Sequence, residues 1–291
     1  MTLNRSCVDE VTFHQHKFYI KRDDKIHKYL SGNKYRKLHT LINTQASKLN
    51  TVISYGGLQS NAMLSMAYMC YKKGWEFLYY VKRVPSNLVN NPSSNYKKAL
   101  EFNTKFIEVD ESKYDSEIDR IKNLKDEKLF VINQGGAQIE AEDGVKVLAD
   151  ELKEFIKDKS IAIVTPSGTG TTAYFLAKNL PHVDVYTTPC VANESYLKEQ
   201  MSLLGDELSN LHVINTTKKY HFAKPYKEFY QTYKELIKQT GIEFDLIYAP
   251  KTWLALLENI SKIDKDILYV HSGGVLGNES MIERYMYKRL I

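Results

Sequence analysis

The feature that most constrains this fold is a regular alternation along the chain. Short runs rich in β-branched and aromatic residues are separated by longer segments with the 3.6-residue period of helices. Strands that alternate with helices form parallel sheets, because the crossover helices pack on both faces. About nine strands in 291 residues predict open, twisted, mostly parallel sheets in a two-lobed α/β protein. We expect strands at 51–55, 76–82, 105–109, 128–133, 160–165, 183–188, 211–215, 244–248 and 267–271.

Composition and charge argue against several classes of protein. The chain is 43% hydrophobic, and its net charge of +5 comes from lysines interleaved with acidic residues, so no basic stripe indicates a nucleic-acid partner. Cys7, Cys70 and Cys190 lack the spacing of a disulfide framework or a zinc site, so we expect no metal and a reducing, cytoplasmic compartment. No secretory signal or membrane-spanning run is found, so we expect no membrane partner.

The stretch SYGGLQSN at 54–61 joins a predicted strand to a predicted helix. Gly56 and Gly57 allow a tight turn. Ser60 and Asn61 then stand at the helix N-terminus, where free N–H groups and the helix dipole favour a carboxylate or a phosphate. A helix cap that binds no ligand also explains Ser60. This corner is therefore a candidate anion site.

A second glycine-rich corner, TPSGTGTTA at 165–173, also lies between a strand and a helix. Its Gly, Ser and Thr residues offer backbone and hydroxyl donors that suit a single phosphate group. GTGTTA also fits the minimal dinucleotide pattern, which leaves a nicotinamide-dependent oxidoreductase as an alternative, although no acidic residue ends the next strand to bind a ribose. A turn without any ligand is the third interpretation.

Two further residues are candidates for chemistry. His271 ends a predicted strand, and a lone histidine there is more often structural than catalytic. Lys34 follows Gly32 and Asn33 at the start of a predicted helix, where an amine among apolar neighbours can be activated for bonding to a carbonyl carbon. Spacing alone leaves a solvated surface lysine as the simpler interpretation.

Six motifs together carry a family resemblance: KRDD (21–24), GNKYRKL (32–38), SYGGLQSN (54–61), SGTGTT (167–172), DLIYAPKTW (245–253) and LYVHSGG (268–274). Their order and spacing resemble the 1-aminocyclopropane-1-carboxylate deaminase and D-cysteine desulfhydrase family, from about residue 18 to the C-terminus. The resemblance implies the tryptophan-synthase-β-like fold, PLP fold type II, with pyridoxal 5′-phosphate as cofactor. We expect a large cofactor-binding lobe of residues 1–50 plus 145–291 and a small lobe of residues 51–144.

The resemblance also implies the residues that carry out the chemistry. Lys34 would bind the cofactor aldehyde covalently and act as base or acid at the substrate's α-carbon. Asn61 would hydrogen-bond the cofactor's ring hydroxyl and contact the substrate, and Ser60 would hold the substrate carboxylate together with the helix N-terminus. Tyr248 would face the substrate and assist proton transfer.

The same resemblance implies that the second glycine-rich corner binds the phosphate of the cofactor, with Lys37 as an extra cation. The residues implied there are Gly168, Thr169, Gly170, Thr171 and Thr172. A bulky side chain at Gly170 is accordingly expected to occupy the space of the phosphate with little loss of folding.

Three positions depart from the family pattern and bear on the substrate. Ala62 stands where relatives carry His or Gln, and Ala249 and Ser272 stand where the cyclopropane-opening members carry Glu and Leu. A serine at the pyridine nitrogen leaves the ring a weaker electron sink than a carboxylate does.

This pattern favours β-elimination from D-cysteine or a similar small amino acid, giving pyruvate, ammonia and sulfide. 1-Aminocyclopropane-1-carboxylate deamination is the alternative, and a non-catalytic amino-acid-binding protein is an alternative of another class. The resemblance suggests a homodimer.

Overall fold

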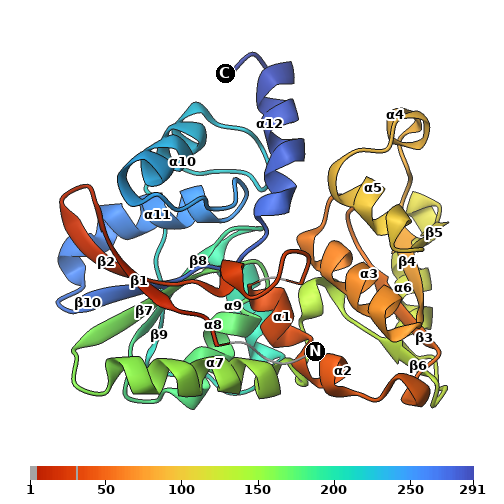
Figure 1. The fold of residues 1–291 in the computed structure, drawn as a ribbon, viewed down its shortest axis with the longest axis horizontal. Coiled ribbons are helices and arrows are strands. Elements are labelled where there is room, and N and C mark those ends of the chain that lie inside the picture. The colour runs from red at the N-terminus through yellow and green to blue at the C-terminus, as the bar shows by residue number, and fades with distance from the viewer. Residues whose placement is uncertain (1–4, 31) are drawn as a thin grey trace.

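The strands form two sheets (Figure 1), within residues 5–30 and 32–291, which the computed structural model describes. The six-stranded sheet has the order β1 (Val8–Phe13), β2 (His16–Lys21), β10 (Asp266–Val270), β7 (Ile161–Ser167), β8 (Val185–Pro189), β9 (Leu211–Val213). The four-stranded sheet has the order β5 (Lys105–Glu108), β4 (Glu76–Val81), β3 (Thr51–Tyr55), β6 (Leu129–Val131).

The pairing is parallel everywhere in these two sheets except between β1 and β2. The mostly parallel α/β architecture is therefore confirmed. The β1–β2 hairpin was not predicted, and the strand expected at 244–248 is wrong, because that segment is irregular. The strands of the small sheet lie between 51 and 131 and those of the large sheet outside that range. The expected lobe boundaries near residues 50 and 145 stay a prediction.

Helices cover both faces of each sheet, as crossover connections require. The α-helices are α1 (Asn33–Lys37), α2 (His39–Asn43), α3 (Asn61–Lys73), α4 (Ser86–Asn90), α5 (Ser94–Glu101), α6 (Tyr114–Lys122), α7 (Ala141–Ile156), α8 (Thr171–Asn179), α9 (Glu194–Ser202), α10 (Lys227–Thr240), α11 (Ala249–Asn259) and α12 (Asn278–Tyr287). Short 3₁₀ helices are η1 (Asp23–Lys25), η2 (Ala46–Lys48), η3 (Glu111–Lys113), η4 (Gln134–Gly136), η5 (Ile260–Lys262) and η6 (Val275–Gly277).

The hydrophobic core is divided by the sheets into layers. On the large sheet, Leu148 of α7 and Phe175 of α8 pack on one face, and Trp253 of α11 packs on the other. On the small sheet, α3 covers one face through Met66, and α6 covers the opposite face through Ile121. Each buried aliphatic or aromatic side chain contributes about 1.5–3 kcal/mol of transfer free energy, so these layers fix the sheets firmly beneath the loops that follow them.

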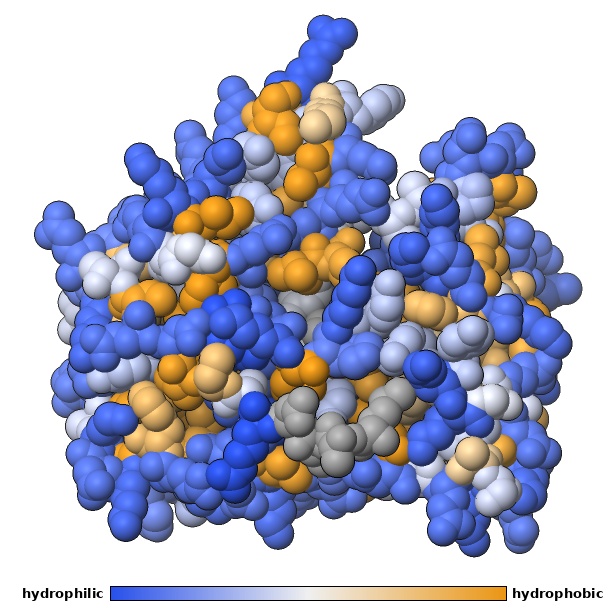
Figure 2. Space-filling view, in the orientation of Figure 1, coloured by the Kyte–Doolittle hydropathy of each residue, from blue (hydrophilic) through white to orange (hydrophobic). Residues whose placement is uncertain are grey.

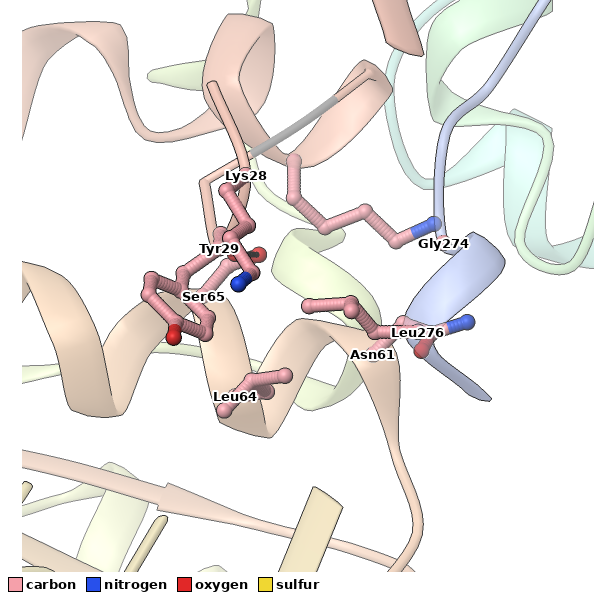
Figure 3. Close-up of a pocket in the computed structure, with 8 residues that line it drawn as sticks. Lys28, Tyr29, Asn61, Leu64, Ser65, Gly274 and Leu276 are labelled. Carbon is pink, nitrogen blue, oxygen red and sulfur yellow. Dashed lines mark hydrogen bonds between the residues drawn. The ribbon is translucent and has the colours of Figure 1, made fainter. Parts of the chain in front are cut away.

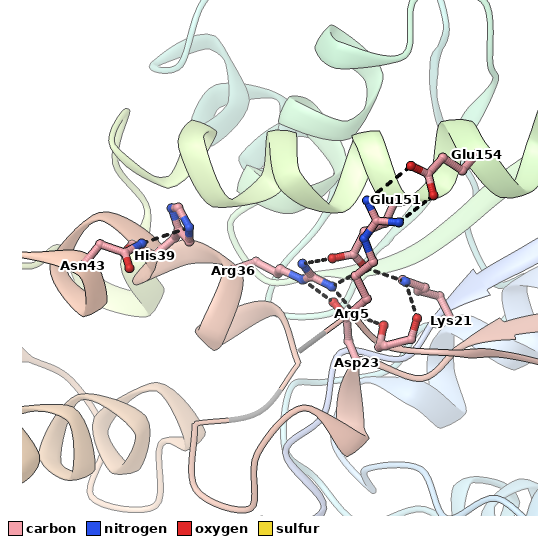
Figure 4. Close-up of polar contacts among 9 residues, drawn as sticks. Arg5, Lys21, Asp23, Arg36, His39, Asn43, Glu151 and Glu154 are labelled. Atoms are coloured by element: carbon pink, nitrogen blue, oxygen red, sulfur yellow. Dashed lines mark hydrogen bonds and ion pairs between the residues drawn. The ribbon is translucent and has the colours of Figure 1, made fainter. Parts of the chain in front are cut away.

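The short helix α1 lies between the two sheets in Figure 1 and is anchored by buried ion pairs (Figure 4). The fully buried Arg36 guanidinium donates to both carboxylate oxygens of Asp23, at 3.0 and 2.9 Å, and to both of Glu151, at 2.8 and 2.9 Å. Lys21 of β2 also donates to Glu151, at 2.6 Å. Burial opposes a charge on Arg36, yet the two carboxylates outweigh it and raise the pKa of Arg36. These contacts fasten α1 to β2, η1 and α7.

The visible molecular face is mostly hydrophilic (Figure 2). Larger apolar side chains that remain exposed, such as Leu203 directly after α9 and Tyr287 at the end of α12, lie in separate parts of the fold. In the part of the chain that the structure describes, no helix is both long and apolar enough to span a bilayer.

Candidate active site

Three groups of predicted site residues, Ser60 with Asn61, Gly168–Thr172 and Ser272, follow the carboxyl ends of β3, β7 and β10, where ligands bind in open α/β sheets. Gly32 explains how α1 reaches this edge. Its backbone has φ +60°, and a Cβ there would lie 1.9 Å from the carbonyl oxygen of Ser272. The N–H of Asn33 donates to that same oxygen at 3.3 Å. A glycine at 32 therefore lets the start of α1, and with it Lys34, pack directly on the loop after β10.

Lys34 lies at the centre of the candidate site. Its Nζ is 5.7 Å from the centroid of the Tyr248 ring. Burial lowers the pKa of Lys34 to about 8, against the opposing attraction of the Asp245 carboxylate. Lys34 forms no ion pair within the described ranges. A lysine in such a setting supplies the neutral amine that nucleophilic chemistry requires.

Lys37, one turn further along α1, is a second partly buried cation. Its Nζ donates to the carbonyl oxygen of Gly135 at 3.0 Å. Burial and the nearby charge of Lys34 lower the pKa of Lys37 to about 7. Two neighbouring lysines without a carboxylate partner in residues 5–30 and 32–291 favour the binding of an anion between them and the adjoining loops.

The loop from Gly168 to Thr172 presents its donors beside Lys37. A Cβ built on Gly135, which accepts from Lys37, would lie 3.9 Å from Cγ2 of Thr169. The hydroxyls of Thr169 and Thr171 are 2.9 Å apart at the N-terminus of α8. The buried Thr172 Oγ1 has no hydrogen-bond partner among the described residues. A helix N-terminus, hydroxyls and a lysine are together the donor set that binds phosphate.

Gly170 has a different role from the one expected. Its φ is +76°, and a Cβ there would lie 2.4 Å from Cγ of Met201 on α9, so it points into the core and not toward the phosphate site. The expectation that a larger residue would displace phosphate with little loss of folding is therefore wrong. Gly168 is the glycine that faces the site, because its Cβ would lie 3.6 Å from the Tyr248 ring.

This correction predicts different outcomes for the two glycines. We expect Gly170→Ala to lower the free energy of unfolding by about 1–3 kcal/mol, because the left-handed backbone and the Met201 contact both oppose a side chain. Gly168→Ala should cost less stability, since its backbone is not left-handed. Urea denaturation of the two variants measures the difference. Equal losses of unfolding free energy in the two variants would contradict the conclusion that position 170 faces the core and position 168 faces the site.

The stretch SYGGLQSN forms the turn from β3 into α3. Ser60 caps α3, since its hydroxyl accepts from the N–H of Met63 at 3.3 Å. Asn61 begins the helix, and its Oδ1 accepts from Nδ2 of Asn95 at 2.9 Å. Ser60 is thus a helix cap in this structure. The N-terminus of this thirteen-residue helix adds a second positive end to the site.

Two hollows adjoin Lys34. One is an open hollow of about 230 Å³, solvent at its mouth included, and is lined by Lys34, Lys28, Tyr29, Asn61, Leu64, Ser65, Gly274 and Leu276. Figure 3 shows Asn61 reaching from α3 toward the turn of Gly274 and Leu276. The other is an open hollow of about 180 Å³, measured in the same way, and is lined by Lys34, Lys37, Leu38, Ala62, Met66, Gly135 and Gly136. Residues from elements that pack on both sheets therefore surround the Lys34 amine.

Tyr248 lies on the large-sheet side of Lys34, where an irregular segment leads into α11. The buried Asp245 carboxylate accepts from the N–H groups of Ile247, at 3.0 Å, and Tyr248, at 2.6 Å. These bonds replace a strand ladder, which explains why no strand forms at 244–248. Burial and the Asp245 charge raise the pKa of Tyr248, so its phenol stays protonated at neutral pH.

The three positions that depart from the family pattern have different surroundings, and Ala62 is the one that lines a hollow beside Lys34. Ala249 is buried in the apolar cluster around Trp253, and Ser272 is buried directly after β10 and His271. His271 accepts from the N–H of Gly273 through Nδ1 and faces the carbonyl of Glu243 through Nε2. Both ring nitrogens of His271 are thus engaged, as expected for a structural histidine.

Sequence reasoning missed Asp245 and Asn95 as site residues. Asp245 stands in the motif DLIYAPKTW, and an acid among apolar residues just before a tyrosine and a proline was the available signal. Asn95 ends the stretch VPSNLVNNPSSN, whose Pro, Asn and Ser content is typical of a surface loop. No local signal indicated that its side chain contacts Asn61, because the contact spans 34 residues.

Comparison with known proteins identifies the class. An open α/β fold with a buried lysine beside a phosphate-type loop is the arrangement of enzymes that hold a phosphorylated carbonyl cofactor. Residues 9–273 match the family model described as "Pyridoxal-phosphate dependent enzyme", so the chain belongs to this family.

Individual relatives agree with this assignment. The chain is 28% identical over 284 residues to a "Putative 1-aminocyclopropane-1-carboxylate deaminase" of Thermotoga maritima, covering 89% of each chain. It is 25% identical to the "D-cysteine desulfhydrase" of Serratia proteamaculans, covering 88% of this chain and 86% of that protein. A solved "ACC deaminase homologue" superposes with a TM-score of 0.77 at 22% identity, covering 96% and 94% of the two chains.

The expected fold type, enzyme class and cofactor are confirmed by this membership, which favours pyridoxal phosphate over the nicotinamide alternative. The residues present fit the cofactor. Pyridoxal phosphate carries an aldehyde, which a neutral amine such as that of Lys34 can bond, and a phosphate dianion. The unpartnered Thr172 hydroxyl and the lysines without carboxylates are groups that such an anion would satisfy.

Proposed function

We propose that this enzyme is a pyridoxal-phosphate-dependent lyase or deaminase that acts on a small amino acid. The observation that supports the proposal most strongly is the partly buried Lys34 amine, with a pKa lowered to about 8, which lies beside Tyr248, whose ring in turn adjoins Gly168 of the donor loop. The cofactor supplies an electron sink for the electron pair that remains when a bond to the substrate's α-carbon breaks.

The chain's own residues would bind and orient the groups around that carbon. Thr169, Thr171 and Thr172 would donate to the cofactor phosphate together with the N-terminus of α8, and Lys37 would balance its charge. Gly168 and Gly170 give this loop its shape, Gly168 on the side of Tyr248. The segment around Ser60 and the N-terminus of α3 would hold the substrate carboxylate, and the Asn61 amide would donate to the ring hydroxyl.

Proton transfer at the α-carbon falls to Lys34, assisted by Tyr248. The Lys34 amine would accept the α-proton, and its lowered pKa favours the neutral form that this role requires. The Tyr248 phenol stays protonated and can donate to a departing group or hold the substrate. In a β-elimination the sulfide leaves from the β-carbon, and the aminoacrylate product hydrolyses to pyruvate and ammonia.

The substrate preference we propose rests on Ala249 and Ser272. Ala249 lies in an apolar cluster and supplies no carboxylate, and Ser272 offers at most a hydroxyl to a pyridine nitrogen. A neutral partner leaves the nitrogen unprotonated more often, so the ring is a weaker electron sink. Expelling sulfide from D-cysteine needs less stabilisation than opening a cyclopropane ring, so we favour D-cysteine. The name of the Thermotoga maritima relative supports 1-aminocyclopropane-1-carboxylate as the second candidate.

Pyruvate release from D-cysteine, L-cysteine and 1-aminocyclopropane-1-carboxylate tests this preference. The protein loaded with pyridoxal phosphate is expected to turn over D-cysteine at least about tenfold faster, in kcat/KM, than the cyclopropane acid. Turnover of the cyclopropane acid without D-cysteine would reject the argument from Ser272. A loaded protein that turns over no amino acid would support the non-catalytic alternative.

We further propose that the enzyme is a homodimer of the cytoplasm. Cys7, Cys70 and Cys190 are free thiols, which suits a reducing compartment. The dimer follows from the family resemblance, and sedimentation equilibrium tests it.

A further inference from the structure

Asn95, near the start of α5, holds the segment that leads into α3. Its side chain is 1% exposed. The N–H of Asn95 donates to Oε1 of Gln59 at 3.0 Å, and its Nδ2 donates to the carbonyl oxygen of Gln59 at 3.0 Å and to Oδ1 of Asn61 at 2.9 Å. One buried amide thus fastens both residues that flank Ser60.

These bonds fix which way the Asn61 amide faces. A backbone carbonyl can only accept, so the atom of Asn95 that faces Gln59 O must be its amino group. The same amino group faces Asn61, which must therefore present its oxygen to Asn95 and turn its own amino group the other way. Among the described residues no hydrogen bond from Asn61 Nδ2 is found, which leaves this donor for a ligand.

The Asn61 amide is also confined from the opposite side. Cβ atoms built on Gly274 and Gly277 would lie 2.5 Å from Asn61 Nδ2 and 2.8 Å from its Oδ1. The amide therefore lies closely against the turn at η6, with Asn95 on its other side. Asn61 and Gly274 both line the hollow beside Lys34. The donor that Asn95 orients is thus in the same site as the amine.

The backbone before Asn95 shows that its position is enforced. Ser94 is a non-glycine residue with φ +49°, it is buried, and its Oγ has no partner within the described part of the chain. Such a conformation is strained and persists only where the surrounding contacts over-determine it. The bonds of Asn95 are contacts of that kind.

We propose that Asn95 is a positioning residue that orients the Asn61 amide as a donor to the cofactor's ring oxygen. The inference rests on the proposed function of the site and adds to it a residue that does not itself touch the cofactor. Asn95 acts through Asn61, so its removal should weaken only the interaction that depends on the ring oxygen.

A cofactor analogue without the ring hydroxyl isolates that interaction. We would measure the dissociation constants of pyridoxal 5′-phosphate and 3-deoxypyridoxal 5′-phosphate for the wild-type protein, Asn95→Ala and Asn95→Asp. Both substitutions remove the donor to Asn61, and Asp keeps the size of Asn. The matched control is Asn210→Asp, because Asn210 Nδ2 also donates to backbone carbonyls, that of Ala177 near the C-terminus of α8 and those of Leu180 and Val183 just after it.

The expected result is that each Asn95 variant binds pyridoxal phosphate about tenfold more weakly than wild type and binds the deoxy analogue with unchanged affinity. Asn210→Asp should bind both as wild type does, even where its stability falls. Equal weakening of both compounds in the Asn95 variants, or no weakening, would overturn the inference alone. A wild-type protein that binds neither compound would overturn the proposed function together with it.

Discussion

Replacing Lys34 by alanine is expected to abolish covalent cofactor binding and to lower kcat by at least about a thousandfold, because the same amine bonds the cofactor and moves the α-proton. Folding should be retained, because Lys34 is only partly buried and forms no ion pair in the described ranges, so its removal breaks no such contact. Visible absorbance and steady-state assays of the dialysed variant measure both effects. Residual kcat above a tenth of the wild-type value would contradict the role.

The matched control for this variant is Lys37→Gln. It removes the other partly buried lysine of α1 and should weaken cofactor affinity while the covalent link at Lys34 still forms.

The pH dependence of the wild-type protein gives an independent check. Burial lowers the pKa of Lys34 from 10.5 to about 8, so the neutral, reactive amine becomes the major form only above that pH. The rate of covalent uptake by the cofactor-free protein should therefore rise as pH increases through about 8.

Substituting Arg36 by methionine should lower the free energy of unfolding by about 3–5 kcal/mol. The substitution leaves Asp23 and Glu151 buried with fewer partners, and an uncompensated buried carboxylate is costly. Lys21 still donates to Glu151, whereas Asp23 loses both of its bonds to the guanidinium. Since these pairs fasten α1, the variant should also bind cofactor more weakly. Urea denaturation followed by circular dichroism measures the loss.

The control for Arg36 is an exposed ion pair in the same region. Arg5 donates to Glu154 on α7 at 2.7 Å, but both side chains are more than 60% exposed. Arg5→Met should therefore change the free energy of unfolding by less than about 1 kcal/mol, because solvent screens such a pair. A loss at Arg36 no larger than the loss at Arg5 would show that the buried network does not anchor α1.

The alternation of strands and helices was sufficient to predict the sheets, but two segments show where local pattern fails. The hairpin of β1 and β2 turns at His14 and Gln15, with φ +47° and +66°. These residues carry none of the Asn-Gly or Asp-Gly signal that marks such turns. At 244–248 an apolar run suggested a strand, and the buried carboxylate of Asp245 caps the backbone instead. The spacing of apolar residues along the chain predicts neither the hairpin turn nor the capping by Asp245.

The site was predictable to the extent that its residues stand in contiguous motifs. Lys34, the turn at Ser60 and the loop at Gly168–Thr172 were found in that way, and their assigned roles stay proposals. The prediction that a side chain at position 170 would point toward the phosphate was wrong, because the direction depends on where α9 packs. The contact between Asn95 and Asn61 depends on how α5 packs on α3, which no short stretch of sequence encodes.

Reduction with borohydride followed by peptide mapping tests the central claim most directly. Hydride reduces the carbon–nitrogen double bond between a lysine and pyridoxal phosphate to a stable bond, so the attached residue can be found by mass spectrometry. The account predicts one phosphopyridoxyl group per chain, on the peptide that contains Lys34. Label on Lys37, Lys251 or any other lysine with Lys34 unmodified, or no label at saturating cofactor, would contradict it.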